Sequence, residues 1–254
     1  MKKISQVLTV ILSIVLLSCT TDSNNEEDVN DPTDPANPST NLLLKRTETQ
    51  DDSGENYIIN YIYDGNKLIG YNESDSFNAS YTYENDVVIR EDGYIGDLHE
   101  YYAIYEYDTN NRLIQTTIYF LLGGNNALRN EFTYLSNNEI STKSYSGDHT
   151  AQNNFSHETI DTYINGNWTK RRFVEDGNEF IYNYDNKNGA FKNMELGVFF
   201  QLIEEPGFGA TNNPLFLDGT VYEYEYNSDN YPVSATFYLD DEPNVTSTTQ
   251  YFYE

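Results

Sequence analysis

The chain has few basic residues and a single cysteine. Its 254 residues include 14 lysines and arginines against 41 aspartates and glutamates, a formal net charge of −27. A nucleic-acid-binding protein needs a basic surface to neutralise phosphates, and this composition excludes that class. One cysteine excludes an intrachain disulfide and a cysteine-rich metal site. The common nucleophile, phosphate-loop and zinc-protease motifs are also missing, so we predict a protein that is not an enzyme and needs no cofactor.

Aromatic residues are abundant instead, with 24 tyrosines and 13 phenylalanines against only two methionines. This content is enough to bury a core, which excludes a wholly disordered chain. Tyrosine, threonine, isoleucine and asparagine favour strands and tight turns over helices. The composition therefore predicts one all-β domain.

The first 19 residues have the pattern of an export signal. Lys2 and Lys3 precede an apolar stretch, residues 7–17, that is shorter than the roughly 20 residues of a membrane-spanning helix. The end of this stretch, Leu-Leu-Ser-Cys, resembles a bacterial lipobox. The resemblance implies cleavage between Ser18 and Cys19 and attachment of lipid to Cys19. The alternative is an ordinary signal peptide that ends in a free cysteine.

Residues 19–41 contain almost nothing apolar and cannot bury enough surface to offset their ordering entropy, so we predict a disordered tether. The acidic run at residues 22–28 resembles the surface-export signal of lipoproteins from Bacteroidetes-type bacteria. The resemblance implies an outer-membrane lipid anchor and a cell-surface location. An anchor that faces the periplasm is the alternative.

Residues 42–254 repeat a short phrase in which two aromatic residues flank one other residue and a polar turn follows. The clearest copies span residues 61–69, 81–89 and 105–114. The second aromatic residues of successive copies are 20 to 42 positions apart. The shorter of these spacings are typical of stacked hairpins. They are Tyr63, Tyr83, Tyr107, Tyr134, Tyr163, Tyr184, Tyr226 and Tyr253.

Each copy has the pattern of a β-hairpin. A period of two places both rings on one face of a strand, and Asp, Asn and Gly supply the turn. An apolar residue follows five or six positions after the second ring, where the return strand of a hairpin would place it beside the tyrosines. These residues are Leu68, Val88, Leu113, Ile140 and Trp168. We therefore predict a single antiparallel meander of repeated hairpins.

The phrase resembles the YD (Rhs-type) repeat, in which Tyr-x-Tyr-Asp is followed by a turn, a basic residue and leucine. Residues 108–113 are the closest copy. Residues 186–193 and 222–232 extend the resemblance to a group of uncharacterised Bacteroidetes lipoproteins with degenerate repeats of this kind. The resemblance implies a curved, half-barrel-like or porin-like sheet and no assigned activity. Glu223 and Glu225 alternate with tyrosines, which gives one charged face and argues against a lipid-facing sheet.

One stretch departs from the repeat. Residues 193–205 place Glu195, Val198, Phe199, Leu202 and Ile203 at helical spacings, with Asn193 as a candidate N-cap. The sequence thus predicts a short amphipathic helix near 193–205. It either plugs an end or the concave face of the sheet, or forms an insertion that contacts a ligand.

Three tyrosines, Tyr222, Tyr224 and Tyr226, form the most regular aromatic row and are the candidate ligand-binding residues. Such rows stack on sugars or bind proteins, or else serve as the sheet's own cross-strand core. His149, His157 and Glu158 lack the spacing of a known metal motif, and we predict no metal site there. Residues 185–189 and 108–112 are rich in Asp and Asn, but Lys187 and Arg112 occupy calcium-ligand positions, and turn formation explains both segments.

The sequence leads to three functional hypotheses. The first is a lipid-anchored cell-envelope protein that binds a glycan or a surface protein without catalysis, and that contacts the membrane through its anchor. The second is a purely structural subunit of an outer-membrane assembly. The third is a hydrolase that uses two carboxylates, although 41 acidic residues allow no pair to be singled out.

Overall fold

The computed structural model describes residues 42–254, except residues 137, 218 and 240–241. Within these residues the chain forms 17 strands and one helix, α1 (Gly197–Ile203). No helix in the described residues is both long enough and apolar enough to cross a membrane. The strands are β1 (Leu44–Asp51), β2 (Asn56–Asp64), β3 (Lys67–Glu73), β4 (Phe77–Glu84), β5 (Val87–Ile95), β6 (Leu98–Tyr107), β7 (Leu113–Phe120), β8 (Asn126–Tyr134), β9 (Glu139–Asp148), β10 (Asn154–Ile164), β11 (Asn167–Phe173), β12 (Glu179–Ile181), β13 (Asn183–Tyr184), β14 (Pro214–Leu217), β15 (Thr220–Tyr226), β16 (Pro232–Leu239) and β17 (Glu242–Tyr253).

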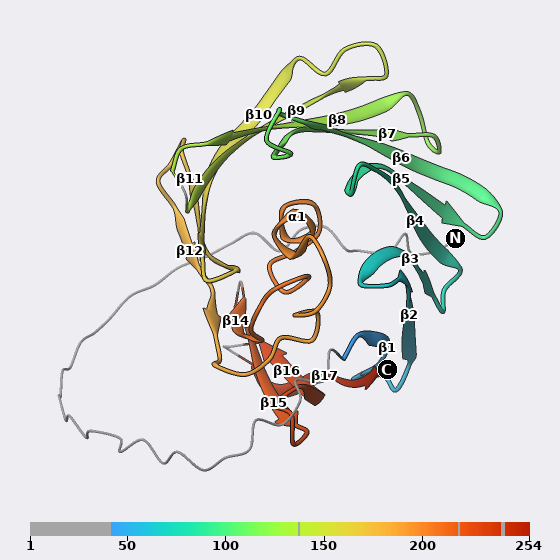
Figure 1. The fold of residues 1–254 in the computed structure, drawn as a ribbon, viewed down its shortest axis with the longest axis vertical. Helices are drawn as coiled ribbons and strands as arrows, with labels where there is room; N and C mark the ends of the chain where they lie inside the picture. Colours follow the sequence, from blue (N-terminus) through green and yellow to red (C-terminus); the bar gives the residue numbers. More distant parts are fainter. Residues whose placement is uncertain (1–41, 137, 218, 240–241) are drawn as a thin grey trace. The chain divides into compact units, whose positions relative to one another are not determined.

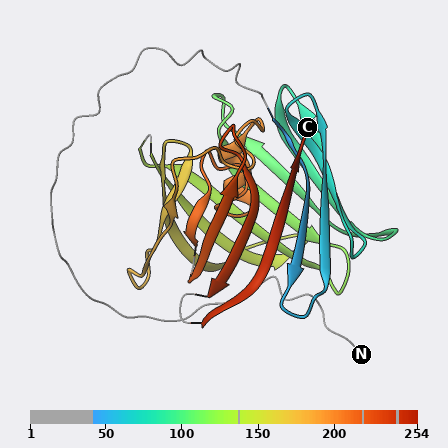
Figure 2. The same ribbon diagram turned by 90° about the horizontal axis from the view of Figure 1, so that it is seen from below.

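The strands form one antiparallel sheet that curves into a ring around α1 (Figure 1, Figure 2). Neighbours in the chain pair with each other, which confirms the predicted meander. The curvature goes beyond a half-barrel, because β17 returns to pair with β1 from Thr47 opposite Tyr251 to Asp51 opposite Ser247. One seam interrupts the ring: β12 pairs with β11 and β13 pairs with β14, while β12 and β13 follow each other in the chain.

The predicted hairpins are confirmed by the register of the strands. The apolar residue of each return strand lies opposite the second aromatic residue of its copy and is at most 5% exposed. These apolar side chains line the inside of the ring with the tyrosines and form its hydrophobic core. The pairs are Tyr63 with Leu68, Tyr83 with Val88, Tyr107 with Leu113, Tyr134 with Ile140, and Tyr163 with Trp168.

Most of these hairpins contain a β-bulge. The register shifts immediately before the second tyrosine, and the extra residue belongs to the return strand. Ile62 pairs with Gly70 and Tyr63 pairs with Leu68, so Ile69 is an extra residue without a partner of its own. The bulge turns Leu68 fully into the core and leaves Ile69 36% exposed on the outside. The bulge explains why the consecutive residues Leu68 and Ile69 are both apolar, although side chains along a strand otherwise alternate between its two faces.

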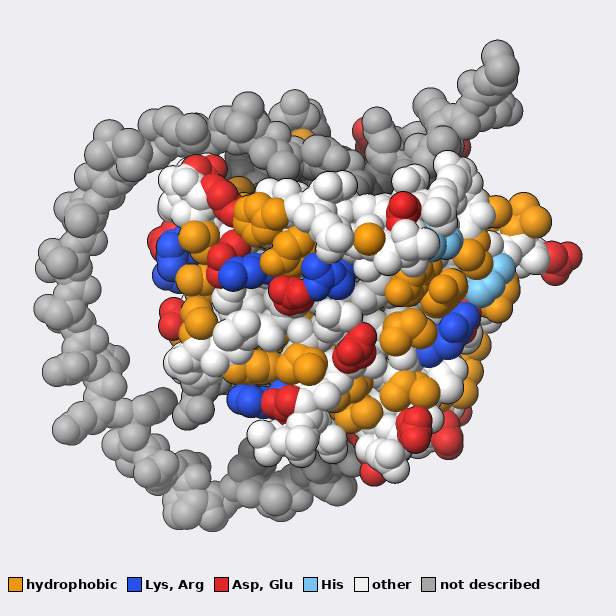
Figure 3. Space-filling model, turned by 90° about the horizontal axis from the view of Figure 1, so that it is seen from above, with side chains coloured by type: hydrophobic (Ala, Val, Ile, Leu, Met, Phe, Trp, Pro, Cys, Tyr) orange, Lys and Arg blue, Asp and Glu red, His pale blue; other side chains and the backbone are white. Residues whose placement is uncertain are grey.

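The outside of the ring is charged, as the sequence predicts. Glu106, Glu223 and Glu225 are exposed, while the tyrosines beside them in the chain are at least partly buried. Figure 3 looks onto the outside of the strands at the top of Figure 1, where acidic, basic and hydrophobic side chains are interspersed. The sheet therefore has an aromatic inner face and a mixed, charged outer face.

The helix is shorter than predicted. Leu196 has a left-handed backbone (φ 62°), so α1 begins at Gly197 and not near Asn193. Asn193 is not the N-cap; its side-chain amide donates hydrogen bonds of 2.8 Å to the carbonyl oxygen of Leu42 and to the hydroxyl of Tyr231. The predicted apolar stripe is also shifted, since Val198 is 41% exposed while Phe200 is fully buried. A helix enclosed by strands packs on more than one side, so a single amphipathic stripe does not describe it.

Residues 185–213, here called the plug segment, run from β13 to β14 through the interior of the ring and contain α1 (Figure 1). The fully buried Gln201 fixes this segment to the β10–β11 turn. Its Oε1 accepts from the Trp168 backbone N–H at 2.8 Å, and its Nε2 donates to the carbonyl oxygen of Gly166 at 2.9 Å. Phe199 and Phe200 pack edge-on against Tyr105 and Tyr81. The predicted plug is therefore present.

Candidate functional site

The tyrosine row on β15 lies on the inner face of the sheet. The rings of Tyr222, Tyr224 and Tyr226 follow one another at centroid distances of 6.3 and 6.0 Å. The Tyr226 hydroxyl donates to Asp185 of the plug segment, and desolvation together with the nearby Glu205 raises the pKa of Tyr222. All three side chains are partly buried. The row thus packs toward the plug segment, and its role in ligand binding stays a prediction.

The other residues singled out from the sequence make separate contacts or lie outside the described residues. Ser18, Cys19 and the tether belong to the residues that the structure does not describe. His149 contacts the carbonyl oxygen of Phe120 at 2.9 Å, while His157 contacts the hydroxyl of Ser156 at 3.0 Å. In the described part of the chain, no group of three or more His, Cys, Asp or Glu side chains could hold a metal ion.

The Asp-rich segments are turns. Asp108 Oδ1 accepts from the backbone N–H groups of Asn110 at 2.8 Å and Arg112 at 3.0 Å, and these bonds lower the pKa of Asp108. Asp185 Oδ1 accepts from the backbone N–H of Lys187 at 3.0 Å in the same way. The carboxylates therefore satisfy the turn backbone, as an Asx turn requires.

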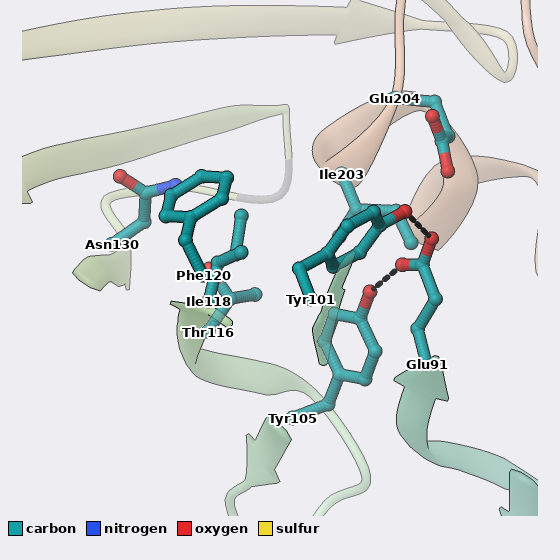
Figure 4. A pocket seen from close by; sticks show the side chains of 9 residues that line it. All are labelled: Glu91, Tyr101, Tyr105, Thr116, Ile118, Phe120, Asn130, Ile203 and Glu204. Atoms are coloured by element: carbon teal, nitrogen blue, oxygen red, sulfur yellow. Dashed lines mark hydrogen bonds between the residues drawn. The ribbon is translucent and has the colours of Figure 1, made fainter. Parts of the chain in front are cut away.

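A cavity of about 160 Å³ lies between the inner face of β5–β8 and the C-terminal end of α1 (Figure 4). It combines carboxylates, hydroxyls, one amide and aromatic rings. We take it as the candidate functional site, because a pocket with a few convergent polar groups is the usual form of a ligand site. Its lining residues are Glu91, Tyr101, Tyr105, Thr116, Ile118, Phe120, Asn130, Ile203 and Glu204.

A β-bulge turns Glu91 toward this cavity. Strict alternation from the inward-facing Val88 would place Glu91 on the outside of β5. The bulge at Ile89 shifts the register by one, so that Thr82 pairs with Arg90 and Tyr81 pairs with Glu91. Arg90 consequently faces outward, and the carboxylate of Glu91 lies on the inner face at only 5% exposure.

Two tyrosines of β6 hold the Glu91 carboxylate (Figure 4). The Tyr101 hydroxyl donates to Oε1 at 2.6 Å and the Tyr105 hydroxyl donates to Oε2 at 2.5 Å. Burial raises the pKa of Glu91, and the two hydrogen bonds oppose this shift. Hydrogen bonds of this length are typical of hydroxyls that donate to an ionised acceptor. The carboxylate is therefore fixed in position from both sides.

A glycine makes room for one of these tyrosines. Tyr101 lies opposite Gly93, and its ring covers the glycine backbone. A Cβ atom on Gly93 would lie 2.2 Å from Cε1 of Tyr101, a distance that no packed structure tolerates. The absence of a side chain at Gly93 thus places the Tyr101 hydroxyl within reach of Glu91.

The second carboxylate comes from the plug segment. Glu204 follows the last residue of α1, and its Oε1 accepts from the Tyr81 hydroxyl at 2.9 Å. It lies inside the ring of strands yet keeps more than a third of its surface accessible, so solvent reaches the cavity beside it. Enclosure by the surrounding protein and repulsion from the Glu91 carboxylate raise the pKa of Glu204 to about 8.

A second cavity of about 330 Å³ lies on another side of α1 and is mostly apolar. Tyr107, Tyr134 and Phe199 contribute rings to its wall, and Arg112 lies at one side with its guanidinium over the Tyr134 ring. Arg112 already forms an ion pair with Asp108 at 2.7 Å. This cavity has no carboxylate in its wall, so the first cavity is the better candidate for polar chemistry.

Sequence reasoning missed the two carboxylates of this site. Glu91 and Glu204 are two among 41 acidic residues, and no local motif marks either of them. The sequence alone does not indicate that Glu91 faces inward, because this orientation depends on the bulge in β5. Tyr105, by contrast, belongs to the third clear copy of the repeat, and its inward face follows from that pattern.

No protein-family model matches this sequence, and no curated protein matches it.

Proposed function

We propose that this protein is a lipid-anchored protein of the bacterial cell envelope that binds a carbohydrate, without catalysis, in the cavity beside Glu91. The observation that carries the proposal is the buried Glu91 carboxylate, held by the hydroxyls of Tyr101 and Tyr105 at the wall of a cavity. An ionised carboxylate offers about four lone-pair sites, and the two tyrosines use two of them. The remaining sites are acceptors for hydroxyl groups of a ligand.

The wall of the cavity also suits a sugar ring. Tyr101 and Phe120 lie at a centroid distance of 6.4 Å and present aromatic surface beside the polar groups. Thr116 and Asn130 add a hydroxyl and an amide to the wall near Phe120 (Figure 4). A sugar has polar hydroxyls around its rim and an apolar C–H face, so acceptors next to rings match both of its surfaces.

The sequence supports the cellular location in this proposal. The lipobox-like end of the apolar stretch provides Cys19 for lipid attachment, and the acidic run after it resembles a surface-export signal. A single lipid-modified cysteine would anchor the domain to the outer membrane through the tether, with the cell surface as the proposed side. A periplasmic orientation would leave the binding proposal unchanged.

The proposal is tested by measuring the melting temperature of the purified full chain in detergent against a panel of oligosaccharides. A ligand at 100-fold its Kd that binds only the folded state adds about 2.7 kcal/mol of stability. We expect one oligosaccharide class to raise the melting temperature of the wild type and of Glu106→Gln, an outward-facing control on β6. Glu91→Gln should lose the effect. A panel without any shift in the wild type would contradict carbohydrate binding.

Two alternatives have their own tests. A structural subunit of an outer-membrane assembly would have no small ligand, and its stable partner would co-purify with the chain.

A hydrolase is favoured by one observation, the presence of Glu91 and Glu204 in one cavity, both with raised pKa values. Glycoside hydrolysis uses such a pair, one as acid and one as base or nucleophile. Release of reducing ends from a polysaccharide, lost in Glu204→Gln, would establish it.

A further inference from the structure

We propose that the ligand of the cavity beside Glu91 carries an amino group and binds as a cation, so that the carbohydrate is an amino sugar with a free amine. This inference rests on the proposed function and specifies its ligand class. The structural reason is that this cavity contains a buried acid without a positive partner.

The described residues contain two buried carboxylates, and they are satisfied differently. Asp161 is 1% exposed and forms a two-point ion pair with Arg171, with N–O distances of 2.8 and 3.0 Å. Glu91 is 5% exposed and has only the tyrosine hydroxyls as hydrogen-bond donors. A buried charge is expensive unless it is paired, and Asp161 shows how this fold pairs one. Among the residues that the structure describes, no cation pairs with Glu91.

The cavity contains no substitute for that cation. None of its nine lining residues is a lysine, an arginine or a histidine, and two of them are glutamates. Glu204 comes from the plug segment and Glu91 from the sheet, so their carboxylates approach the cavity from two elements. An ammonium group between them would interact with both. A neutral ligand would leave both carboxylates without charge compensation.

Aromatic rings complete the environment that an ammonium group prefers. Tyr101, Tyr105 and Phe120 all line the cavity. Elsewhere the same fold places cations over rings, as with Arg171 over Trp168 at 4.1 Å and Arg112 over Tyr134 at 4.7 Å. A bound amine would gain the same attraction from the face of a ring. The formal charge of −27 further raises the local concentration of cations around the protein.

Binding of an amine should be linked to the protonation of the cavity. Glu204 is surrounded by Glu91 and Tyr81 on the sheet and by Glu205 on its own segment, with Glu73 farther along the sheet. Glu91 is surrounded by Tyr101, Tyr105 and its neighbour Asp92. Asp92 is already offset by Arg90 at 2.6 Å, but none of the residues that line the cavity is basic, so a bound ammonium ion favours the ionised forms of Glu91 and Glu204. A proton held by a carboxylate in the free protein then passes to the buffer when the amine binds.

The test compares ligands that differ only in the amine. Isothermal titration of the full chain at pH 7 uses a glucosamine trimer, the N-acetylglucosamine trimer and 1,5-diaminopentane. We expect the glucosamine trimer to bind at least about tenfold more tightly than its acetylated counterpart, the gain typical of a charge-assisted hydrogen bond. The heat of binding should vary with the ionisation enthalpy of the buffer, which reports proton release. Glu91→Gln should bring the two affinities within about twofold, and Glu106→Gln should leave the preference unchanged.

Each outcome separates this inference from the proposed function. Equal binding of the two trimers would overturn the proposal that the ligand binds through its amine, and would leave carbohydrate binding in place. Binding of the diamine but of neither trimer would keep the cation and overturn the carbohydrate. No binding of any of the three compounds would overturn both. If Glu91→Gln fails to fold, Tyr101→Phe replaces it, because it removes one donor from Glu91 and should change the affinity for the glucosamine trimer more than that for the acetylated trimer.

Discussion

The hydroxyl of Tyr107 lies 2.6 Å from the carbonyl oxygen of Val88 and donates a hydrogen bond to it. The two residues belong to successive hairpins, and the same contact recurs from Tyr83 to Leu68 at 2.7 Å and from Tyr184 to Trp168 at 2.7 Å. The second tyrosine of a repeat thus binds the backbone of an earlier hairpin at the residue before its bulge. A basic residue stacks on some of these rings, as Lys67 does on Tyr83. The repeat therefore specifies contacts between hairpins as well as the hairpins themselves.

Tyr107→Phe tests this contact. The substitution removes one hydrogen bond and leaves the carbonyl oxygen of Val88 without that donor, while the ring remains. We expect the free energy of unfolding to fall by about 1 kcal/mol, measured by urea denaturation. Tyr102→Phe is the matched control, because Tyr102 lies on the outer face of the same strand beneath Arg90. An equal loss in both variants would show that the contact between hairpins has no special role.

The bulge predicts losses of stability of different size for substitutions at two neighbouring residues. Leu68→Ala should lower the free energy of unfolding by about 2–5 kcal/mol, because Leu68 is fully buried and its truncation leaves a cavity. Ile69→Ala should cost no more than about 1 kcal/mol, because Ile69 is 36% exposed on the outside. Urea denaturation of both variants decides the matter. A larger loss at Ile69 would mean that the bulge is misplaced.

Gly93→Ala tests the placement of Tyr101. The added methyl group would lie 2.2 Å from the Tyr101 ring and must displace it, which moves the hydroxyl away from Glu91. We expect ligand affinity to fall at least about tenfold, because the carboxylate loses one of the donors that position it. Gly207→Ala is the control, since the nearest atom to its added Cβ would be 3.5 Å away. Unchanged affinity in Gly93→Ala would separate Tyr101 from the site.

Glu204 predicts a pH dependence of stability with a defined sign. Its pKa is raised from 4.5 to about 8 in the folded protein, so between these values the folded chain binds more protons than the unfolded chain. The contribution of this group is therefore fully present below pH 4.5 and is lost as the pH rises through the folded pKa. The melting temperature of the wild type should therefore fall as the pH rises through this range, and Glu204→Gln should make that fall smaller. Glu106→Gln, which changes the net charge equally on the outer surface, should leave it in place.

The hairpins were predictable from the sequence because their signals are local. Aromatic pairs with period two and Asp, Asn or Gly turns determine where each strand turns back, and the register places Leu68 and Trp168 in the core as expected. The bulges were not predictable, since two adjacent apolar residues fit either face. For the same reason the inward orientation of Glu91, and with it the candidate site, could not be predicted by counting alternate residues.

The helix was predictable in place but not in extent. Its apolar residues lie between β13 and β14 as expected, yet the left-handed backbone of Leu196 delays the start of the helix to Gly197, four residues after Asn193. This conformation depends on contacts with the sheet, such as the hydrogen bond from the backbone N–H of Glu195 to the carbonyl oxygen of Asn66 at 3.0 Å. Contacts between residues so far apart in the chain leave no local trace in the sequence.

The pairing of β1 with β17 constrains the order in which this domain can be completed. Thr49 has Tyr57 as its partner on one side and Thr249 on the other, and the two partners are nearly 200 residues apart. One side of β1 stays an unpaired edge until the end of the chain has been synthesised, and unpaired edges invite pairing with other molecules. Closing the ring requires a contact between its first and last strands, which is slow for chains of high contact order. A nascent chain of this protein therefore carries an unpaired edge at β1 for most of its synthesis.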